Sequence, residues 1–271
     1  MARRTLFLGV DDTDMPGTMG TGRLARMLLE RLAESGLQPV GVTRHQLLVH
    51  PDIPYTSHNS SACLELVSVS DDEDVHDGSD VTVAADAAIR KIAETAEEYL
   101  LKHAAKGSDV GLCLEWAENV PGEVVEFGRS AQERVLRIAD ARDLASRHGI
   151  FLKPLTGTGG GVIGALSAVG LRSYGTDGRY LHLGGIRELI GVVTVADALA
   201  AGIAAVVDAD GNNVPADVRI NTLDWVRPAL VGGRPVLKLT KSEGDDNDME
   251  PDGARESFNR RRQKQSVGGK S

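Results

Sequence analysis

The chain has 271 residues, 41% of them hydrophobic and 25% charged, a composition typical of a globular protein with one large or two ordinary domains. No apolar run approaches the roughly 20 residues of a membrane span, and the N-terminal apolar stretch is too short for a secretory signal, so we expect a cytoplasmic protein without membrane contact. The net charge of −9 argues against non-specific nucleic-acid binding, which relies on Lys and Arg neutralising phosphates.

The N-terminal third predicts alternating strands and helices. Residues 5–10 read as a buried strand, 22–35 as a helix with its leucines on one face, and 38–49 as a second strand, which together predict a βαβ start. The segment 50–61 contains two prolines and small polar residues, so we expect a loop, and the alternating residues 62–70 predict a further strand.

The central part continues the pattern. The acidic segment 71–80 reads as a solvated loop, after which we expect a long helix over 83–105 and a strand over 109–116. Residues 129–149 predict one helix, with Ser130 and Glu133 spaced as a capping box. A strand at 150–155 then precedes a glycine-rich segment, 156–170.

These elements predict an α+β (α/β-like), two-lobed fold with a mixed sheet. We expect a nucleotide-binding domain over 1–172, followed by a small α+β lobe or closing edge over 173–240 that contains a hairpin at Gly232-Gly233. Residues 241–271 carry equal numbers of acidic and basic side chains and few apolar ones, so we expect a disordered tail.

Three acids, Asp11, Asp12 and Asp14, follow the first predicted strand directly. Ligands of α/β proteins commonly bind at the carboxyl ends of parallel strands. Crowded carboxylates repel one another, which raises the pKa of at least one of them. Mg²⁺ relieves such repulsion and often bridges carboxylates to substrate phosphates, so we predict that these three acids are metal ligands.

A Gly/Thr-rich loop then leads into the first predicted helix, whose first N–H groups are free to bind an anion. Glycines at 17, 20 and 22 allow close approach of a ligand to the backbone. We therefore predict that Thr13, Gly20, Thr21 and Gly22 contact the phosphates of ATP. The loop is not a Walker A motif, because no Gly-Lys-Ser/Thr follows.

Other interpretations of this segment stay open. The acids could cap turns or be solvated, and the glycines could simply form a loop. Asp12-Thr13-Asp14 also fits the D-x-D-x-[TV] start of haloacid-dehalogenase-type phosphatases, although Pro16 stands at the last position and no G-D-x-x-x-D motif is found in the part expected to fold.

Three motifs together resemble the catalytic portion of the archaeal tRNA 2-agmatinylcytidine synthetases. They are GVDDTDMPGTMGTGRLA, HPDIPYTSHNSSACLEL and GTGGGVIGALSAVG, and the resemblance covers about residues 5–175. It implies a kinase-like domain that binds ATP and Mg²⁺, with agmatine and a tRNA cytidine as the family's substrates. Asp11 and Asp12 would then act in catalysis, and Thr21 matches the threonine that the family enzyme phosphorylates on itself.

The chain departs from the family's pattern at all three motifs. Gly20-Thr21-Gly22 replaces C-T-T, Pro54–Ser61 lacks the lysine and arginine of P-W-K-T-R-G-N-G, and Gly160 replaces the arginine of G-R-G. These changes remove three cations that would stabilise phosphoryl chemistry. Cys63 and Cys113 form no CxxC pair, so we expect a relative without the family's zinc ribbon and OB-fold.

The resemblance also suggests further binding residues. His58 and Asn59 occupy the loop of the second motif and are candidate substrate-binding residues. Lys153 is the nearest cation that could replace the missing arginine, and Gly159, Gly160 and Gly161 are candidates for contact with the nucleotide.

The resulting hypothesis is a Mg-ATP-dependent enzyme, either a ligase of the agmatinylcytidine-synthetase type or a small-molecule kinase. A nucleotide is the expected partner, and tRNA is possible but not supported by the acidic body. The alternative from another class is a non-catalytic nucleotide-binding or regulatory protein, in which the lost cations reflect lost chemistry.

Overall fold

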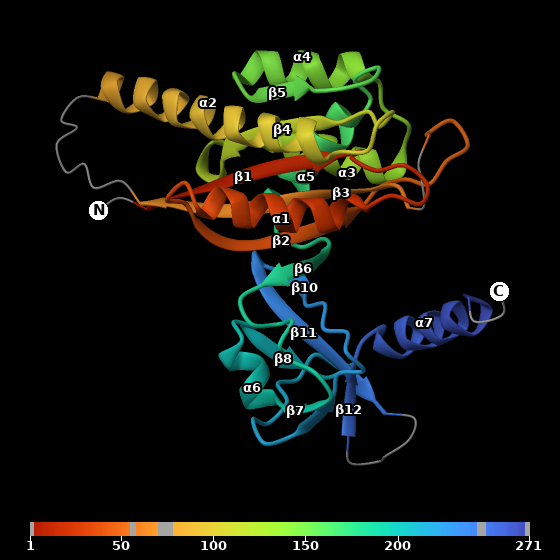
Figure 1. Cartoon of the computed structure of the whole chain (residues 1–271). Coiled ribbons are helices and arrows are strands. Elements are labelled where there is room, and N and C mark those ends of the chain that lie inside the picture. The colour runs from red at the N-terminus through yellow and green to blue at the C-terminus, as the bar shows by residue number, and fades with distance from the viewer. Residues whose placement is uncertain (1–2, 55–57, 70–77, 243–247, 269–271) are drawn as a thin grey trace. The chain divides into compact units, whose positions relative to one another are not determined.

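A computed structural model describes residues 3–54, 58–69, 78–242 and 248–268 of the chain, which divides into two compact units (Figure 1). The first unit ends at Leu181 and the second begins at His182. This division falls later than the expected boundary at 172, because Tyr180 is buried and Leu181 packs against the core of the first unit.

The first unit contains most of the predicted elements. In chain order they are β1 (Arg3–Asp11), α1 (Thr21–Ala33), β2 (Gln38–Gln46), β3 (Ser60–Val69), α2 (Gly78–His103), β4 (Gly111–Trp116), the 3₁₀ helix η1 (Ala117–Asn119), α3 (Gly122–Glu133), α4 (Ile138–His148), β5 (Phe151–Pro154), α5 (Gly161–Tyr174) and β6 (Arg179–Leu183), which crosses the boundary. The first predicted strand and helix are confirmed within a few residues. Part of the acidic segment 71–80 lies outside the described residues.

The sheet of the first unit has the strand order β5-β4-β1-β3-β2, with every one of these neighbours antiparallel. The predicted βαβ start is present in split form, because β3 lies between β1 and β2, as in ferredoxin-like arrangements. The expectation that the acids end a strand with parallel neighbours is therefore wrong. The two neighbours of β1 in the sheet are β3 and β4, and both run antiparallel to it.

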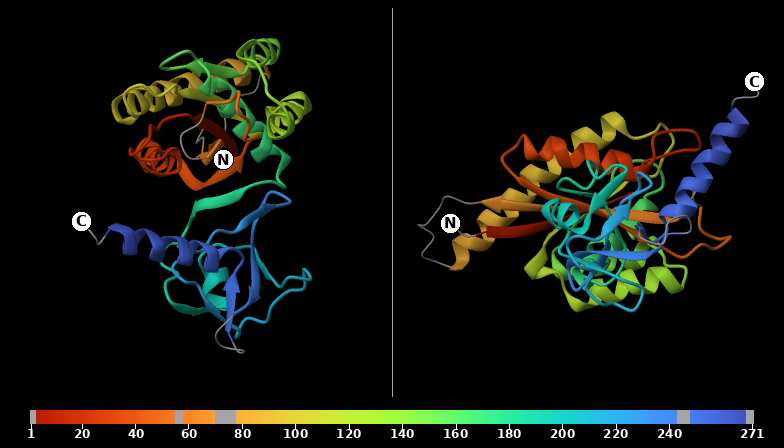
Figure 2. Two further views of the ribbon diagram at one scale, coloured as in Figure 1. Left: turned by 90° about the vertical axis from the view of Figure 1, so that its right-hand side faces the viewer. Right: turned by 90° about the horizontal axis from the view of Figure 1, so that it is seen from below.

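Helices cover both faces of this sheet (Figure 2, left view). On one face, α1 and α2 bury leucines and alanines against Leu6, Leu8 and Val10 of β1. On the other face, α3, α4 and α5 pack against Phe7 and the buried, unpaired thiols Cys63 and Cys113. The alternation of β1 side chains between two cores decides which acid faces which helices.

The single helix predicted over 129–149 is wrong, because two helices occupy this segment. Helix α3 ends at Glu133, and Arg134 adopts an extended backbone with φ −146° and ψ 158°. Ser130 therefore lies in the last turn of α3 rather than at a helix start. At the beginning of α4, the Asp140 carboxylate accepts hydrogen bonds from the Arg137 backbone N–H at 3.2 Å and from the Arg137 guanidinium at 2.7 Å, which caps that helix start.

The second unit is built from short strands. After β6 it contains β7 (Val192–Thr194), α6 (Val195–Ala200), β8 (Ala205–Val207), β9 (Arg219–Asn221), β10 (Ala229–Val231), β11 (Arg234–Lys241), β12 (Asp248–Pro251) and α7 (Ala254–Gly268). The predicted hairpin is confirmed, since β10 and β11 pair through Val231 and Arg234 around two glycines of positive φ.

Residues 241–271, for which the sequence predicts disorder, contain β12 and α7. The buried carboxylate of Glu250 accepts hydrogen bonds from Ser242 and Arg255, which link β11, β12 and α7. These polar contacts supply order where apolar residues are few. Among the described residues, no helix combines the length and apolar character that a membrane span requires.

Candidate functional site

Asp11 is the last residue of β1 and faces α5. Its carboxylate lies directly against Gly164, where an added Cβ would overlap it. The pKa of Asp11 is raised to about 7, chiefly by burial and to a smaller extent by the negative charges of Asp12 and Asp14. The neutral form of Asp11 is thus favoured below about pH 7, and an approaching cation would favour the charged form.

Glycines bring α5 into direct contact with the sheet. A Cβ on Gly9 of β1 would overlap the Ala165 carbonyl, and one on Gly111 of β4 would overlap the Gly161 backbone. Part of the glycine-rich segment therefore serves helix–sheet packing rather than ligand approach. The packing also fixes Asp11 at the N-terminal end of α5.

Asp12 follows in the left-handed region, with φ 50°. Aspartate tolerates this conformation better than most residues, but it remains strained. The pKa of Asp12 rises to about 6, first because of burial and then because of the charges of Asp109 and Asp14. A strained backbone thus holds this carboxylate close to two others.

Asp109, which the sequence interpretation missed, joins this acidic group from the connection between α2 and β4. Its Oδ1 accepts a hydrogen bond from Gly159 N at 2.6 Å, and its Oδ2 accepts one from the Thr158 hydroxyl. Burial raises the pKa of Asp109, but these bonds outweigh burial and the net pKa is lowered. Asp109 therefore stays charged and anchors the glycine loop beside Asp12.

Thr21, the first residue of α1, connects the acidic loop to that helix. Its Oγ1 accepts hydrogen bonds from Thr13 Oγ1 at 3.0 Å and from Thr13 N at 3.3 Å, and it donates to Asp14 Oδ1 at 3.3 Å. Thr13 is buried, and its hydroxyl is bonded within this loop. The Thr21 oxygen thus lies between a donor and a carboxylate that can accept its proton.

A cavity of about 370 Å³ opens beside these groups, entirely within the first unit. One part of its wall is acidic, one part carries two arginines and one part is apolar. The polar part of the lining includes Asp11, Asp12, Asp14, Asp109, Thr21, His58, Asn59, Ser60, Arg134, Arg137, Gly160 and Gly161, and apolar lining comes from Leu47, Ile53, Pro54, Val135, Leu136, Ile138 and Ile163. Such a wall suits a ligand with an apolar ring and a charged tail.

The structure brings most predicted site residues together. His58 lines this cavity and also a smaller neighbouring one, whereas Gly20 and Gly22 line only the smaller one. Asn59 lines the larger cavity but uses its side chain to donate to Leu48 O at 2.6 Å, which fixes the loop. Gly159 holds Asp109 and is not a lining residue. Residues 55–57 of the second motif lie outside the described residues.

Lys153 is not brought to the site. Its ammonium pairs with Glu97 of α2 at 2.6 Å, and it lines neither cavity. The cations that do line the larger cavity, Arg134 and Arg137, come from the extended connection between α3 and α4. No clear signal in the sequence points to them, because they lie in a segment that reads as one continuous helix.

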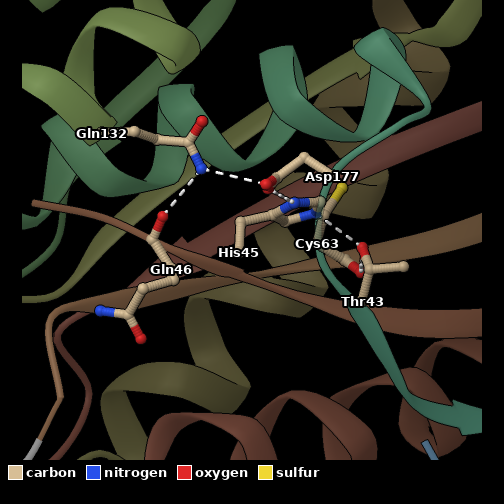
Figure 3. A network of polar contacts seen from close by, with 6 residues as sticks. All are labelled: Thr43, His45, Gln46, Cys63, Gln132 and Asp177. Carbon is tan, nitrogen blue, oxygen red and sulfur yellow. Dashed lines mark hydrogen bonds and ion pairs between the residues drawn. The ribbon is translucent and has the colours of Figure 1, made fainter. Parts of the chain in front are cut away.

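A buried polar network fixes one wall of the cavity (Figure 3). His45 of β2 bonds to Asp177 through Nδ1 at 3.2 Å and to Thr43 through Nε2 at 2.8 Å. Gln132 of α3 donates to Asp177 Oδ1 and to the Gln46 carbonyl. The end of β2, next to the lining residue Leu47, is thereby tied to α3.

Within the described residues, no three His, Cys, Asp or Glu side chains are arranged to hold a metal ion by themselves. The predicted shell of Asp11, Asp12 and Asp14 is therefore not preformed. Mg²⁺ is usually held by only one or two carboxylates, with phosphates and waters completing its octahedron. Asp11 and Asp12, with their raised pKa values, fit that mode, and the metal assignment stays a prediction.

No protein-family model matches this chain. The chain is 27% identical over 169 residues to the tRNA 2-agmatinylcytidine synthetase TiaS of Pyrococcus horikoshii, a match that covers 61% of this chain and 35% of that protein. This chain is a partial relative of TiaS. It spans about a third of the length of that curated relative.

Solved structures similar to this chain include a tRNA fluorescent labeling enzyme and apo TiaS, each 24% identical with a TM-score of 0.46. A complex of TiaS with its isoleucine tRNA and ATP is 25% identical, with a TM-score of 0.47. Each match covers 61% or 62% of this chain, and the aligned part is 35% or 36% of the solved chain.

Proposed function

We propose that the larger cavity binds Mg-ATP and that the protein is an ATP-dependent enzyme of the TiaS type. The observation that carries this proposal is the meeting of Asp11, Asp12, Asp14 and Asp109 beside Thr21, in a cavity whose other walls supply arginines and apolar side chains. The partial sequence likeness to TiaS, a protein solved in complex with ATP and tRNA, supports a nucleotide as ligand.

The cavity gives the nucleotide an orientation. The apolar side chains around Leu136 and Ile53 provide a surface for the base, and the acids lie at the strand end, where phosphates bridged by Mg²⁺ would bind. When bound, Mg²⁺ neutralises charge on the phosphates and acids. Asp11 and Asp12, whose pKa values are raised by burial, are the candidate ligands whose charged forms gain most from that neutralisation.

Thr21 is the proposed nucleophile of a kinase-like step. Its Oγ1 forms the new bond to the γ-phosphorus while the bond to the β,γ-bridging oxygen breaks, so that ADP leaves. The Thr21 proton passes to Asp14, whose Oδ1 already accepts it in a hydrogen bond. Arg134 is placed to balance negative charge in this step, in place of the cations missing from the three motifs, whereas the guanidinium of Arg137 is paired with Asp140.

The second candidate function is nucleotide binding without chemistry. It is favoured by the two hydrogen bonds that Thr21 Oγ1 accepts from Thr13, which give this hydroxyl a structural role. The catalytic alternatives are a small-molecule kinase and a tRNA-modifying ligase, which differ in the class of acceptor.

Incubation of the purified chain with MgCl₂ and ATP labelled at the α or the γ phosphate separates these possibilities. Release of labelled AMP supports a ligase. A γ-label that mass spectrometry locates on Thr21, and that is absent from Thr21→Val, supports the kinase-like step. Tight binding without turnover supports the regulatory alternative, and absence of ATP binding contradicts all three.

A further inference from the structure

A second cavity, of about 140 Å³, adjoins the first within the same unit. The two cavities share Asp14, Thr21, His58 and Ser60, so the Thr21–Asp14 pair borders both. The second cavity is also lined by Gly20, Gly22, Arg44, Ser61, Ala62 and Leu181. Among the residues of the second cavity, only Thr21 and Asp14 have a role in the chemistry proposed above.

Arg44 is the distinctive group of this cavity. It lies on β2, half-buried, and its Nε donates to Ser60 Oγ at 2.8 Å while Nη2 donates to Gln46 Oε1 at 3.4 Å. Burial lowers its pKa, and no carboxylate offsets this effect. Both of these hydrogen-bond partners are neutral, so the positive charge of Arg44 has no counter-ion among the described residues.

Two other buried or half-buried arginines of the fold are paired. The guanidinium of Arg172, which is 6% exposed, forms an ion pair with Glu65, and Arg255 pairs with the buried Glu250. Withdrawing an unpaired charge from water costs free energy, which is why proteins usually supply a partner. An unpaired guanidinium on a cavity wall is therefore suited to a counter-ion from outside the chain.

The start of α1 adds to the positive potential of the same cavity. The N–H groups of Thr21 and Gly22 lie in the first turn, where no earlier carbonyl of the helix can accept them, and both residues line the cavity. Asp14 is the opposing charge, and its carboxylate is engaged by the Thr21 hydroxyl. The space accommodates a small oxyanion rather than a whole nucleotide.

We propose that this second cavity binds an oxyanion, a phosphate or carboxylate group, through the Arg44 guanidinium and the N-terminus of α1. Its role as the subsite for the acceptor rests on the proposed function, because the shared Thr21–Asp14 pair would then lie between nucleotide and acceptor. The site selects an anionic group, whereas a cationic amine would face an arginine.

The test uses the full chain and inorganic phosphate as probe. Calorimetric titration of phosphate is carried out on the unmodified protein and on Arg44→Gln, each with and without saturating Mg-ATP. Loss of a charged hydrogen bond predicts at least about a tenfold weaker phosphate affinity in the variant. ATP affinity should change by less than about twofold, because Arg44 does not line the larger cavity.

Two matched arginine variants serve as controls. Arg129→Gln alters an arginine of α3 that pairs with Glu126 and lines neither cavity, so phosphate binding should be unchanged. Arg134→Gln alters the larger cavity and should weaken ATP but not phosphate. If Arg44→Gln fails to fold, as judged by circular dichroism, Arg44→Lys replaces it and should retain measurable phosphate binding that is weaker than in the unmodified protein.

Phosphate that binds together with ATP supports a separate acceptor site. Phosphate that binds through Arg44 but is displaced by ATP, and not by adenosine, supports occupation by the nucleotide's own phosphate. Equal phosphate affinity in the unmodified protein and Arg44→Gln, or no phosphate binding in a protein that still binds ATP, overturns the inference. Absence of ATP binding together with Arg44-dependent phosphate binding overturns only the proposed function.

Discussion

The hydroxyl of Thr21 donates a hydrogen bond to Asp14, with 3.3 Å between Oγ1 and Oδ1. Because the same oxygen accepts two hydrogen bonds from Thr13, the pair joins the acidic loop to the first turn of α1. A single side chain thus combines a fold-stabilising role with a position next to a proton acceptor, at the border of both cavities.

Replacement of Thr21 by valine should destabilise the protein, because the Thr13 donors and Asp14 then lose a buried partner. We expect the free energy of unfolding to fall by about 1–3 kcal/mol, measured by urea denaturation. Thr21→Ser should retain most of the stability. Thr95→Val is the matched control, since the Thr95 hydroxyl only donates to the Lys91 carbonyl on an exposed part of α2; equal losses at both positions would contradict the account.

Asp11 should make stability depend on pH. Its pKa is about 7 in the folded protein and near 3.8 unfolded, so the folded state binds a proton more tightly between these values. In EDTA, the free energy of unfolding should therefore fall as pH rises from about 4 to 7, by up to about 1.4 kcal/mol per pH unit from this group. Asp11→Asn should flatten that limb, and an unchanged pH profile in the variant would show that Asp11 is not the group responsible.

Gly164→Ala should disrupt the site, because its Cβ would overlap the Asp11 carboxylate. Overpacking of this kind costs typically about 1–3 kcal/mol, and displacement of Asp11 should also weaken nucleotide binding. Gly122→Ala is the control, since no heavy atom lies within 4 Å of the added Cβ at the start of α3. Thermal unfolding and calorimetry on both variants provide the comparison, and a Gly164→Ala protein as stable as Gly122→Ala would refute the packing.

His45 should also affect stability at acidic pH. Burial lowers its pKa in spite of the opposing effect of Asp177, so protonation of His45 favours the unfolded state. The contribution of His45 to stability should therefore decline as pH falls below about 6.5, the ordinary histidine value, and so oppose the contribution of Asp11 in the same pH range. Asp177→Asn removes the charge that assists protonation and should lower the His45 pKa further, which NMR titration of the imidazole can follow; a raised pKa would contradict the prediction.

Periodicity alone located β1, α1 and the acids between them, because alternation and helical spacing are local properties. The distant partner of those acids, Asp109, depends on the antiparallel register that places Asp11 opposite Gly111, which no local pattern reveals. The same limit applies to Arg134 and Arg137, whose position follows from the break between α3 and α4.

The glycine-rich segment shows a different limit. Gly160 and Gly161 line the larger cavity, and Gly161 and Gly164 let α5 lie on β4 and Asp11. Glycine serves both close ligand approach and close backbone packing, so its spacing does not distinguish the two. The ion pair of Lys153 with Glu97 is equally hidden from a local pattern, since Glu97 lies on a helix far away in sequence.

Calorimetric titration of ATP in MgCl₂ and in EDTA, on the unmodified protein and on Asp12→Asn, tests the central claim that the acidic group binds a nucleotide through Mg²⁺. We predict binding that requires Mg²⁺ and that weakens by about tenfold or more in the variant, which corresponds to loss of about 1.4 kcal/mol or more. ATP binding of equal affinity in EDTA, or equal affinity in Asp12→Asn, would contradict the account.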